Sequence, residues 1–126
     1  MKLLIDSHAL VWSATDRSSL SIRAREAITD PSNQVIVSAI TAYELELKRL
    51  RDPLLAELPD DLDDAVTGQN FEWLQVTAKH ASEAAKLPRL HGDPFDRIIV
   101  AQAFAEQAVV VSADRWFPGY GVPLLW

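Results

Sequence analysis

Short apolar runs recur along the chain and alternate with longer segments in which apolar residues stand three or four positions apart. The runs predict buried strands at Lys2–Ile5, Val35–Val37 and Val109–Val111, with weaker candidates at Leu74–Val76 and Leu124–Leu125. The longer segments predict helices over Leu20–Ile28, Ile40–Leu50, 59–70, Thr77–Leu87 and Pro94–Gln107. Strands that alternate with helices indicate an α/β fold with a central, mostly parallel sheet.

The spacing within the second predicted helix defines one apolar face. The residues on that face are Ile40, Tyr43, Leu47 and Leu50. Glu44 lies at the border of the face. In the Ala-rich segment further along, Thr77 is the expected N-cap of its helix.

The composition is that of a globular protein with one core. With 126 residues, 48% of them hydrophobic and 24% charged, the chain is expected to form a single domain over residues 1–126. The absence of cysteine excludes disulfides, thiolate zinc sites and a cysteine nucleophile. Asp6 and His8 interrupt the apolar start after a few residues, so we expect neither a signal peptide nor a membrane span, and a cytoplasmic protein.

The net charge of -6 is a local feature. Seven of the 18 acidic residues lie in the segment 52–72, which has no base, so the rest of the chain holds 11 acids against 12 bases. The negative total therefore does not exclude a polyanionic substrate.

Four carboxylates from distant parts of the sequence are predicted to meet at one edge of the sheet. Asp6 follows the first strand, Glu44 lies near the start of the helix after the second, Asp96 lies in the first turn of another helix, and Asp114 follows a late strand. In open parallel sheets, ligands bind at the carboxyl ends of the strands. The four acids are therefore the candidate site.

Each acid also has an ordinary structural explanation. Asp6 could cap a helix that begins at Ser7 or His8, and Glu44 could form a surface pair with Lys48, four residues later. Asp114 could support a turn.

Asp93 followed by Pro94 is a typical helix start, which would place Asp96 at the third helical position. There Asp96 could close a capping-box-like pair or favour the helix dipole. Four unrelated explanations at one sheet edge are a poorer account than one shared site.

Clustered carboxylates repel one another unless one is protonated or a cation lies between them. Oxygen ligands without cysteine favour magnesium (Mg2+) or manganese (Mn2+) over zinc. His8, His80 and His91 have no mutual metal-ligand spacing, so no catalytic histidine is expected.

Four motifs occur in order along the chain: LLIDSHALVW, SAITAYELELKR, HGDPFDRIIVAQA and VVVSADRWFPGYGVPLLW. Together they resemble the PIN-domain family, and within it the VapC-type toxins of bacterial type II toxin–antitoxin systems. The resemblance implies a three-layer α/β/α fold and a magnesium-dependent endoribonuclease that cleaves RNA. It further implies an antitoxin encoded alongside, with a homodimer or a toxin–antitoxin hetero-oligomer as the assembly and no membrane partner.

Carried over residue by residue, Asp6, Glu44, Asp96 and Asp114 match the acidic quartet of the family, as catalytic residues and metal ligands. Asp93 is an additional acid, either a metal ligand or only a helix cap.

The resemblance also assigns supporting positions. Ser112 could hydrogen-bond a site carboxylate, and Ser38 could do the same or serve as a plain cap. Lys48 and Arg97 could contact RNA phosphate, or form charge pairs with Glu44 and Asp93.

Other functions fit the same residues less well. A phosphatase of the haloacid-dehalogenase type needs a second Asp two residues after the first, where this chain has His8. A response-regulator receiver would need paired acids after the first strand and a lysine after a late one, and neither is evident. The remaining alternative is a metal-binding but non-catalytic interaction module that engages an antitoxin or nucleic acid.

Overall fold

Five strands form one sheet in the order β3-β2-β1-β4-β5. The computed structural model describes all 126 residues, with strands β1 (Lys2–Ile5), β2 (Gln34–Ser38), β3 (Glu72–Leu74), β4 (Val109–Val111) and β5 (Leu124–Leu125). Every pair of neighbouring strands is parallel, which confirms the predicted α/β class.

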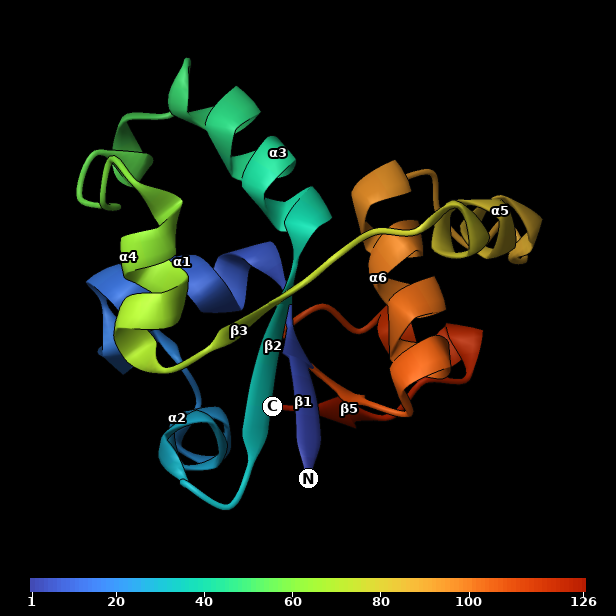
Figure 1. The fold of residues 1–126 in the computed structure, drawn as a ribbon, viewed down its shortest axis with the longest axis horizontal. Helices are drawn as coiled ribbons and strands as arrows, with labels where there is room; N and C mark the ends of the chain where they lie inside the picture. Colours follow the sequence, from blue (N-terminus) through green and yellow to red (C-terminus); the bar gives the residue numbers. More distant parts are fainter.

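Six α-helices cover the two faces of the sheet. They are α1 (Ser7–Thr15), α2 (Ile22–Thr29), α3 (Ala39–Arg49), α4 (Leu62–Val66), α5 (Ala78–Lys86) and α6 (Pro94–Glu106). Figure 1 shows α1, α2 and α4 on one side of the sheet and α6 on the other, with α5 packed outside α6. The predicted three-layer α/β/α arrangement is therefore confirmed. None of the helices combines the length and apolar character that a membrane span requires.

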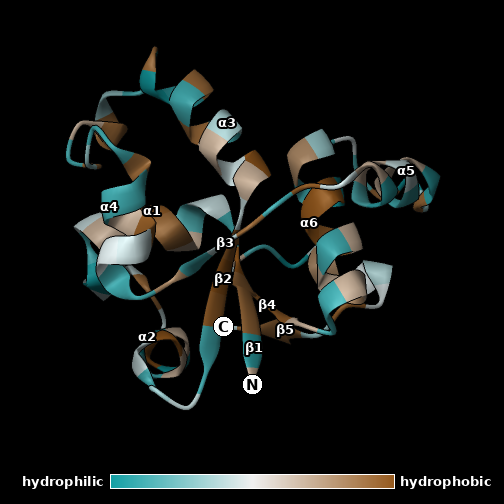
Figure 2. Ribbon diagram, in the orientation of Figure 1, coloured by the Kyte–Doolittle hydropathy of each residue, from teal (hydrophilic) through white to brown (hydrophobic).

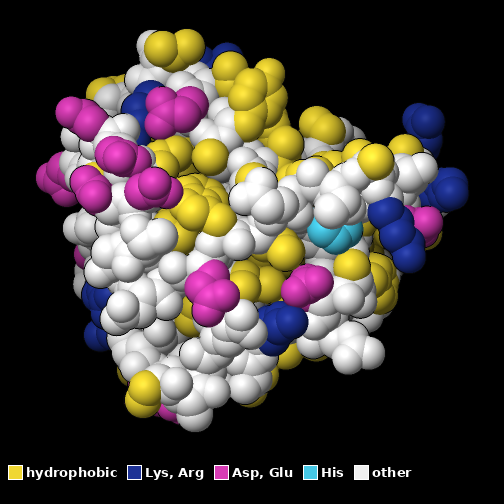
Figure 3. All heavy atoms as spheres, viewed as in Figure 1, with side chains coloured by type: hydrophobic (Ala, Val, Ile, Leu, Met, Phe, Trp, Pro, Cys, Tyr) yellow, Lys and Arg dark blue, Asp and Glu magenta, His cyan; other side chains and the backbone are white.

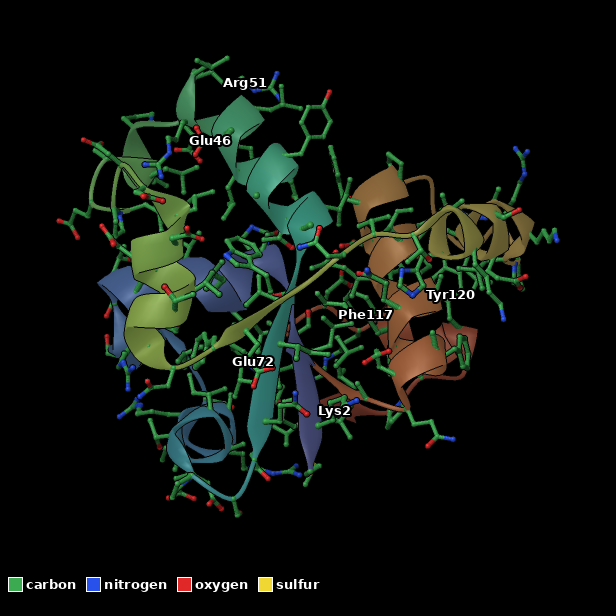
Figure 4. All side chains as sticks on the ribbon, in the orientation of Figure 1. Lys2, Glu46, Arg51, Glu72, Phe117 and Tyr120 are labelled. Carbon is green, nitrogen blue, oxygen red and sulfur yellow. The ribbon has the colours of Figure 1, made fainter.

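The core is divided between the two faces because successive strand residues point in opposite directions. On β1, Leu3 and Ile5 join the apolar cluster beneath α1, α2 and α4, while Leu4 joins the cluster beneath α6. Phe117 belongs to this second cluster and lies between the sheet and α6 (Figure 4). Figure 2 shows β1 and β2 as apolar over most of their length, with hydrophilic residues at their N-terminal ends, as expected for strands covered on both faces. Each fully buried side chain of this size contributes about 1.5–3 kcal/mol.

Helix α1 was predicted only as one alternative for Asp6, as a helix beginning at Ser7 or His8, and the structure confirms that alternative. Helix α1 begins directly after Asp6, and five of its nine residues are buried. Its apolar residues Ala9, Leu10, Val11 and Trp12 are consecutive, so they do not show the helical spacing that marked the other helices. The predicted polar helix over 59–70 is shorter than expected, because α4 gives way to a 3-10 turn at Thr67–Gln69.

The apolar face predicted for α3 does not face the core. Tyr43 is 59% exposed and Leu50 is 85% exposed, whereas Thr41, Glu44 and Leu45 are buried. Helix α3 follows directly from the carboxyl end of β2 (Figure 1) and packs through Leu45 in the core. Glu44 is buried on the same side, which is unusual for a charged residue without a packing role.

Strand register brings the expected residues to one edge. Ile5, the last residue of β1, aligns with Val37 on β2 and with Val111 on β4. The next residues along these strands, Asp6, Ser38 and Ser112, therefore lie in one row at the carboxyl edge. Strand β1 has β2 on one side and β4 on the other, so the strand order reverses at β1. In open α/β sheets, ligands bind at the carboxyl ends of the strands at such a point, which is where this row lies.

Candidate metal centre

Asp6 is both a helix cap and a buried acid. Its Oδ1 accepts a hydrogen bond from the Ala9 N–H at 2.8 Å, and its Oδ2 accepts one from the Ser112 hydroxyl. The residue is only 4% exposed, and burial raises the pKa of its carboxyl group, although the bonds from Ser112 and Ala9 act in the opposite direction. The capping explanation and the shared-site explanation therefore describe the same residue.

Asp96 lies at the centre of the negative charge. Asp93 caps α6 through its Oδ1, which accepts from the N–H groups of Phe95 at 2.9 Å and of Asp96 at 3.2 Å. Burial, together with the charges of Asp93, Asp6 and Asp114, raises the pKa of Asp96 to about 7, although the hydrogen bond from His91 acts in the opposite direction. Three acids from separate parts of the chain thus act on the Asp96 carboxyl group.

Ser112 connects Asp114 to Asp6. The Ser112 hydroxyl oxygen accepts the N–H of Asp114 at 2.9 Å while the hydroxyl donates to Asp6. One oxygen of Asp114, Oδ1, accepts the N–H of Trp116 at 2.9 Å, so Asp114 also stabilises its own turn. A fully buried serine therefore holds two candidate metal ligands next to each other.

Glu44 is a buried carboxylate with an unsatisfied oxygen. The residue is 5% exposed, and its Oε2 accepts a charge-assisted bond from the Lys48 ammonium group at 2.6 Å. Its Oε1 is buried without any hydrogen-bond partner. An unpaired buried acceptor costs about 1–3 kcal/mol, and more when charged, so the pair is not an ordinary surface salt bridge.

The set of free oxygens fits a hard divalent cation. Hydrogen bonds engage one oxygen each on Glu44, Asp96 and Asp114, and leave the other without a protein donor. Ligand atoms of Asp96, Asp114 and His91 lie within 4.8 Å of one another. Carboxylate oxygens in this number suit Mg2+ or Mn2+. A cation there would also relieve the repulsion that raises the pKa of Asp96.

Two further predicted residues have structural partners. The Ser38 hydroxyl caps α3 by accepting the Ile40 N–H at 3.2 Å. The Arg97 guanidinium group lies at the end of α5 and donates to the carbonyl oxygens of Ala84, Leu87 and Pro88. The structure does not pair Arg97 with Asp93, and these three bonds hold α5 against α6. Contact of Arg97 with RNA phosphate stays a prediction.

His91 belongs to the cluster although no histidine was expected there. Its Nε2 lies 3.3 Å from Asp96 Oδ2, and its Nδ1 lies 2.7 Å from the Tyr120 hydroxyl. Spacing between histidines does not reveal this residue, because its partner is a carboxylate five residues later. The useful signal was its position just before the Asp-Pro helix start.

Charge is distributed unevenly around the molecule. Figure 3 shows acidic side chains gathered mainly over α4 and the segment before it, and Lys and Arg side chains around α5. An open cavity of about 680 Å³ lies under α5, and its lining includes Arg89, His91 and Arg97. His91 belongs both to this cavity and to the acidic cluster, so the basic side of the molecule adjoins the candidate site.

Fold and site together define a class: a parallel α/β domain with a candidate divalent-metal centre at the carboxyl edge of its sheet. The family model described as PIN domain matches residues 3–122. The chain therefore belongs to the PIN-domain family, whose members are generally nucleases. No curated protein matches the chain in sequence.

Solved structures share the fold over almost the whole chain. DNA-bound VapBC from Salmonella typhimurium contains a chain with a TM-score of 0.72 and 19% identity, covering 98% of this chain and 96% of that one. VapBC2 from Rickettsia felis, bound to a promoter DNA fragment, contains a chain with a TM-score of 0.70 and 17% identity, covering 98% of this chain and 97% of that one. FitAcB from Neisseria gonorrhoeae contains a chain with a TM-score of 0.56 and 18% identity, covering 97% of this chain and 95% of that one. At these identities the likeness concerns the fold.

Proposed function

We propose that this protein is a magnesium-dependent endoribonuclease that acts in the cytoplasm as the toxin of a type II toxin–antitoxin module. The observation that carries the proposal is the buried Glu44 carboxylate, whose Oε1 has no partner, in the same cluster as Asp6, Asp96 and Asp114. A purely structural protein gains nothing from like charges held together in this way. A bound cation would offset the repulsion between these carboxylates, and it could then bind an RNA phosphate.

The residues divide the work by position. Asp6, Asp96 and Asp114 would hold one or two Mg2+ ions, or Mn2+, and Glu44 would either join them or orient the attacking water and accept its proton. When bound, Mg2+ supplies charge neutralisation at the phosphoryl oxygens and a lowered pKa for water. Ser112 holds Asp6 in place by donating a hydrogen bond to it. Lys48 binds Oε2 of Glu44 and leaves Oε1 available to a metal ion or a water molecule.

The products follow from the direction of attack. Water attacks phosphorus in line with the 3′ oxygen while Glu44 accepts its proton, the bond from phosphorus to that oxygen breaks, and the leaving oxygen takes a proton from solvent to become a hydroxyl group. The fragments then carry a 5′-phosphate and a 3′-hydroxyl. The basic side of the molecule around α5, next to the site, is where we place the RNA strand.

An antitoxin is the proposed protein partner, because the similar chains come from VapBC complexes. We infer that it is encoded alongside and inserts a basic side chain among the site acids, where it competes with metal. The exposed apolar residues Tyr43, Leu47, Leu50 and Leu54 offer contact area for a homodimer or a toxin–antitoxin hetero-oligomer.

End-mapping of cellular RNA tests the proposed function. Induction of the wild-type chain should arrest growth and produce new fragments with 5′-phosphate ends at defined positions, whereas Asp6→Asn should give neither. Both proteins must accumulate to the same level. A wild-type chain that leaves cellular RNA intact, or cuts no more than Asp6→Asn, would instead favour the non-catalytic interaction module.

A further inference from the structure

The Asp96 carboxylate depends on one side chain for its orientation. Asp6 receives hydrogen bonds on both oxygens and Asp114 receives one from a backbone N–H. The only donor to the carboxylate of Asp96 is His91, whose Nε2 lies 3.3 Å from Oδ2. Both side chains are largely buried, at 15% and 16% exposure, so solvent does little to replace this contact.

Tyr120 determines which nitrogen of His91 carries the proton. The tyrosine is 7% exposed, and its hydroxyl has a single partner, His91 Nδ1, at 2.7 Å. As a metal ligand Asp96 is an ionised carboxylate, which only accepts, so Nε2 of His91 must donate to it. In the neutral imidazole Nδ1 then accepts, and the Tyr120 hydroxyl donates to it. The neutral imidazole then carries its hydrogen on Nε2 and donates it to Asp96 Oδ2. The pattern is that of an outer-shell group that fixes a metal ligand.

The same segment of chain holds the ring and a second acid. The His91 ring lies 5.5 Å from the ring of Trp116 and 5.5 Å from that of Tyr120, at 35° and 54°. The backbone N–H of Trp116 donates to Asp114 Oδ1. Tyr120 lies beside α6, which begins with Asp96 in its first turn (Figure 4). The segment 114–120 thus positions Asp114 directly and Asp96 through His91.

We propose that His91 is a positioning residue, which together with Tyr120 fixes Oδ2 of Asp96 and leaves Oδ1 free for a divalent cation. This role rests on the metal site of the proposed function. His91 does not coordinate the cation itself, since its Nε2 carries the hydrogen. Removal of outer-shell partners of this kind typically lowers metal affinity 10–100-fold.

Calorimetric titration with Mn2+, in the absence of RNA, measures the role without relying on cleavage. We expect His91→Ala to weaken Mn2+ binding by about 10–100-fold. His91→Gln, whose amide can still donate to Asp96, should recover most of the loss. Tyr120→Phe should fall between the wild type and His91→Ala, because the ring remains but the tautomer is no longer fixed. Thr29→Val is the control: it removes an exposed hydroxyl at the end of α2, outside the site, and should bind like the wild type.

The outcomes separate this inference from the proposed function. Wild-type protein that binds no Mn2+ would overturn the metal site, and the inference with it. Wild-type binding that His91→Ala and His91→Gln both leave within about twofold would overturn the positioning role alone. Electron spin-echo spectra of the Mn2+ complex give a second readout. Coupling of Mn2+ to an imidazole nitrogen that disappears in His91→Gln would show direct ligation, and would contradict our assignment.

Discussion

Asp96→Asn is expected to reduce the rate of RNA cleavage in Mg2+ by a factor of about 10³ or more, while leaving a folded protein. The carboxylate lies among three other acids and would hold the cation that neutralises charge in the transition state. Such stabilisation is worth several kcal/mol, and each 1.36 kcal/mol is a factor of ten in rate. The measurement is the initial rate on a single-stranded RNA at saturating Mg2+.

Substitutions elsewhere show whether the effect belongs to the site. Asp6→Asn, Asp114→Asn and Glu44→Gln should lose activity to a similar degree, and Asp93→Asn should be milder, since asparagine also caps a helix. The matched control is Asp64→Asn, an exposed acid of α4 outside the site, which should cleave at the wild-type rate. A rate for Asp96→Asn within a few-fold of Asp64→Asn would exclude Asp96 from catalysis.

Without metal, Asp96→Asn should be more stable than the wild type above pH 7. The pKa of Asp96 is raised from 3.8 to about 7 by folding, so the folded protein binds this proton more readily than the unfolded chain. The stabilisation from this group is complete below about pH 4 and is lost as the pH rises to about 7. At 1.36 kcal/mol per pKa unit, the loss is at most about 4 kcal/mol. Asparagine does not titrate and avoids it.

Magnesium should reverse the order. An ion that binds only the folded state stabilises it by about 2.7 kcal/mol at a hundredfold excess over its dissociation constant. The wild type should gain this in full and Asp96→Asn much less. Thermal melts of both proteins at pH 5 and pH 8, in EDTA and in millimolar Mg2+, measure the difference in stability between wild type and variant under each of the four conditions. A variant that is less stable at pH 8 in EDTA and gains as much from Mg2+ as the wild type would disprove the shared metal site.

Most of the sheet could be predicted because its signals are local, although β3 begins two residues before the predicted Leu74–Val76. The apolar runs that became β1, β2 and β4 are buried on both faces, so each is recognisable without knowledge of its neighbours. Asp6 and Asp114 could be brought to the same edge because strands of a parallel sheet end at a common edge. The C-terminal edge strand β5 was predicted on its apolar pair alone, and the structure confirms it.

What the sequence did not predict depends on tertiary contacts. The apolar stripe of α3 indicated burial, but the helix packs through Leu45 and Ile40, with Glu44 buried on the same side, while Tyr43 and Leu47 are exposed. No local pattern distinguishes these two orientations. Arg97 looked like a free basic residue until the end of α5 supplied three carbonyl oxygens. His91 and Tyr120 are 29 residues apart, and only the fold brings them into contact.

The central claim is that Asp6, Asp96 and Asp114 share one divalent-metal site, and anomalous diffraction from crystals soaked in Mn2+ tests it most directly. The account predicts a Mn2+ peak between these three carboxylates, with the Glu44 oxygen that lacks a protein partner directed toward the same site. In crystals of Asp96→Asn the peak should be lost or much weaker. Wild-type crystals that bind Mn2+ only at the exposed acids of the segment 52–72, with nothing between Asp6, Asp96 and Asp114, would contradict it.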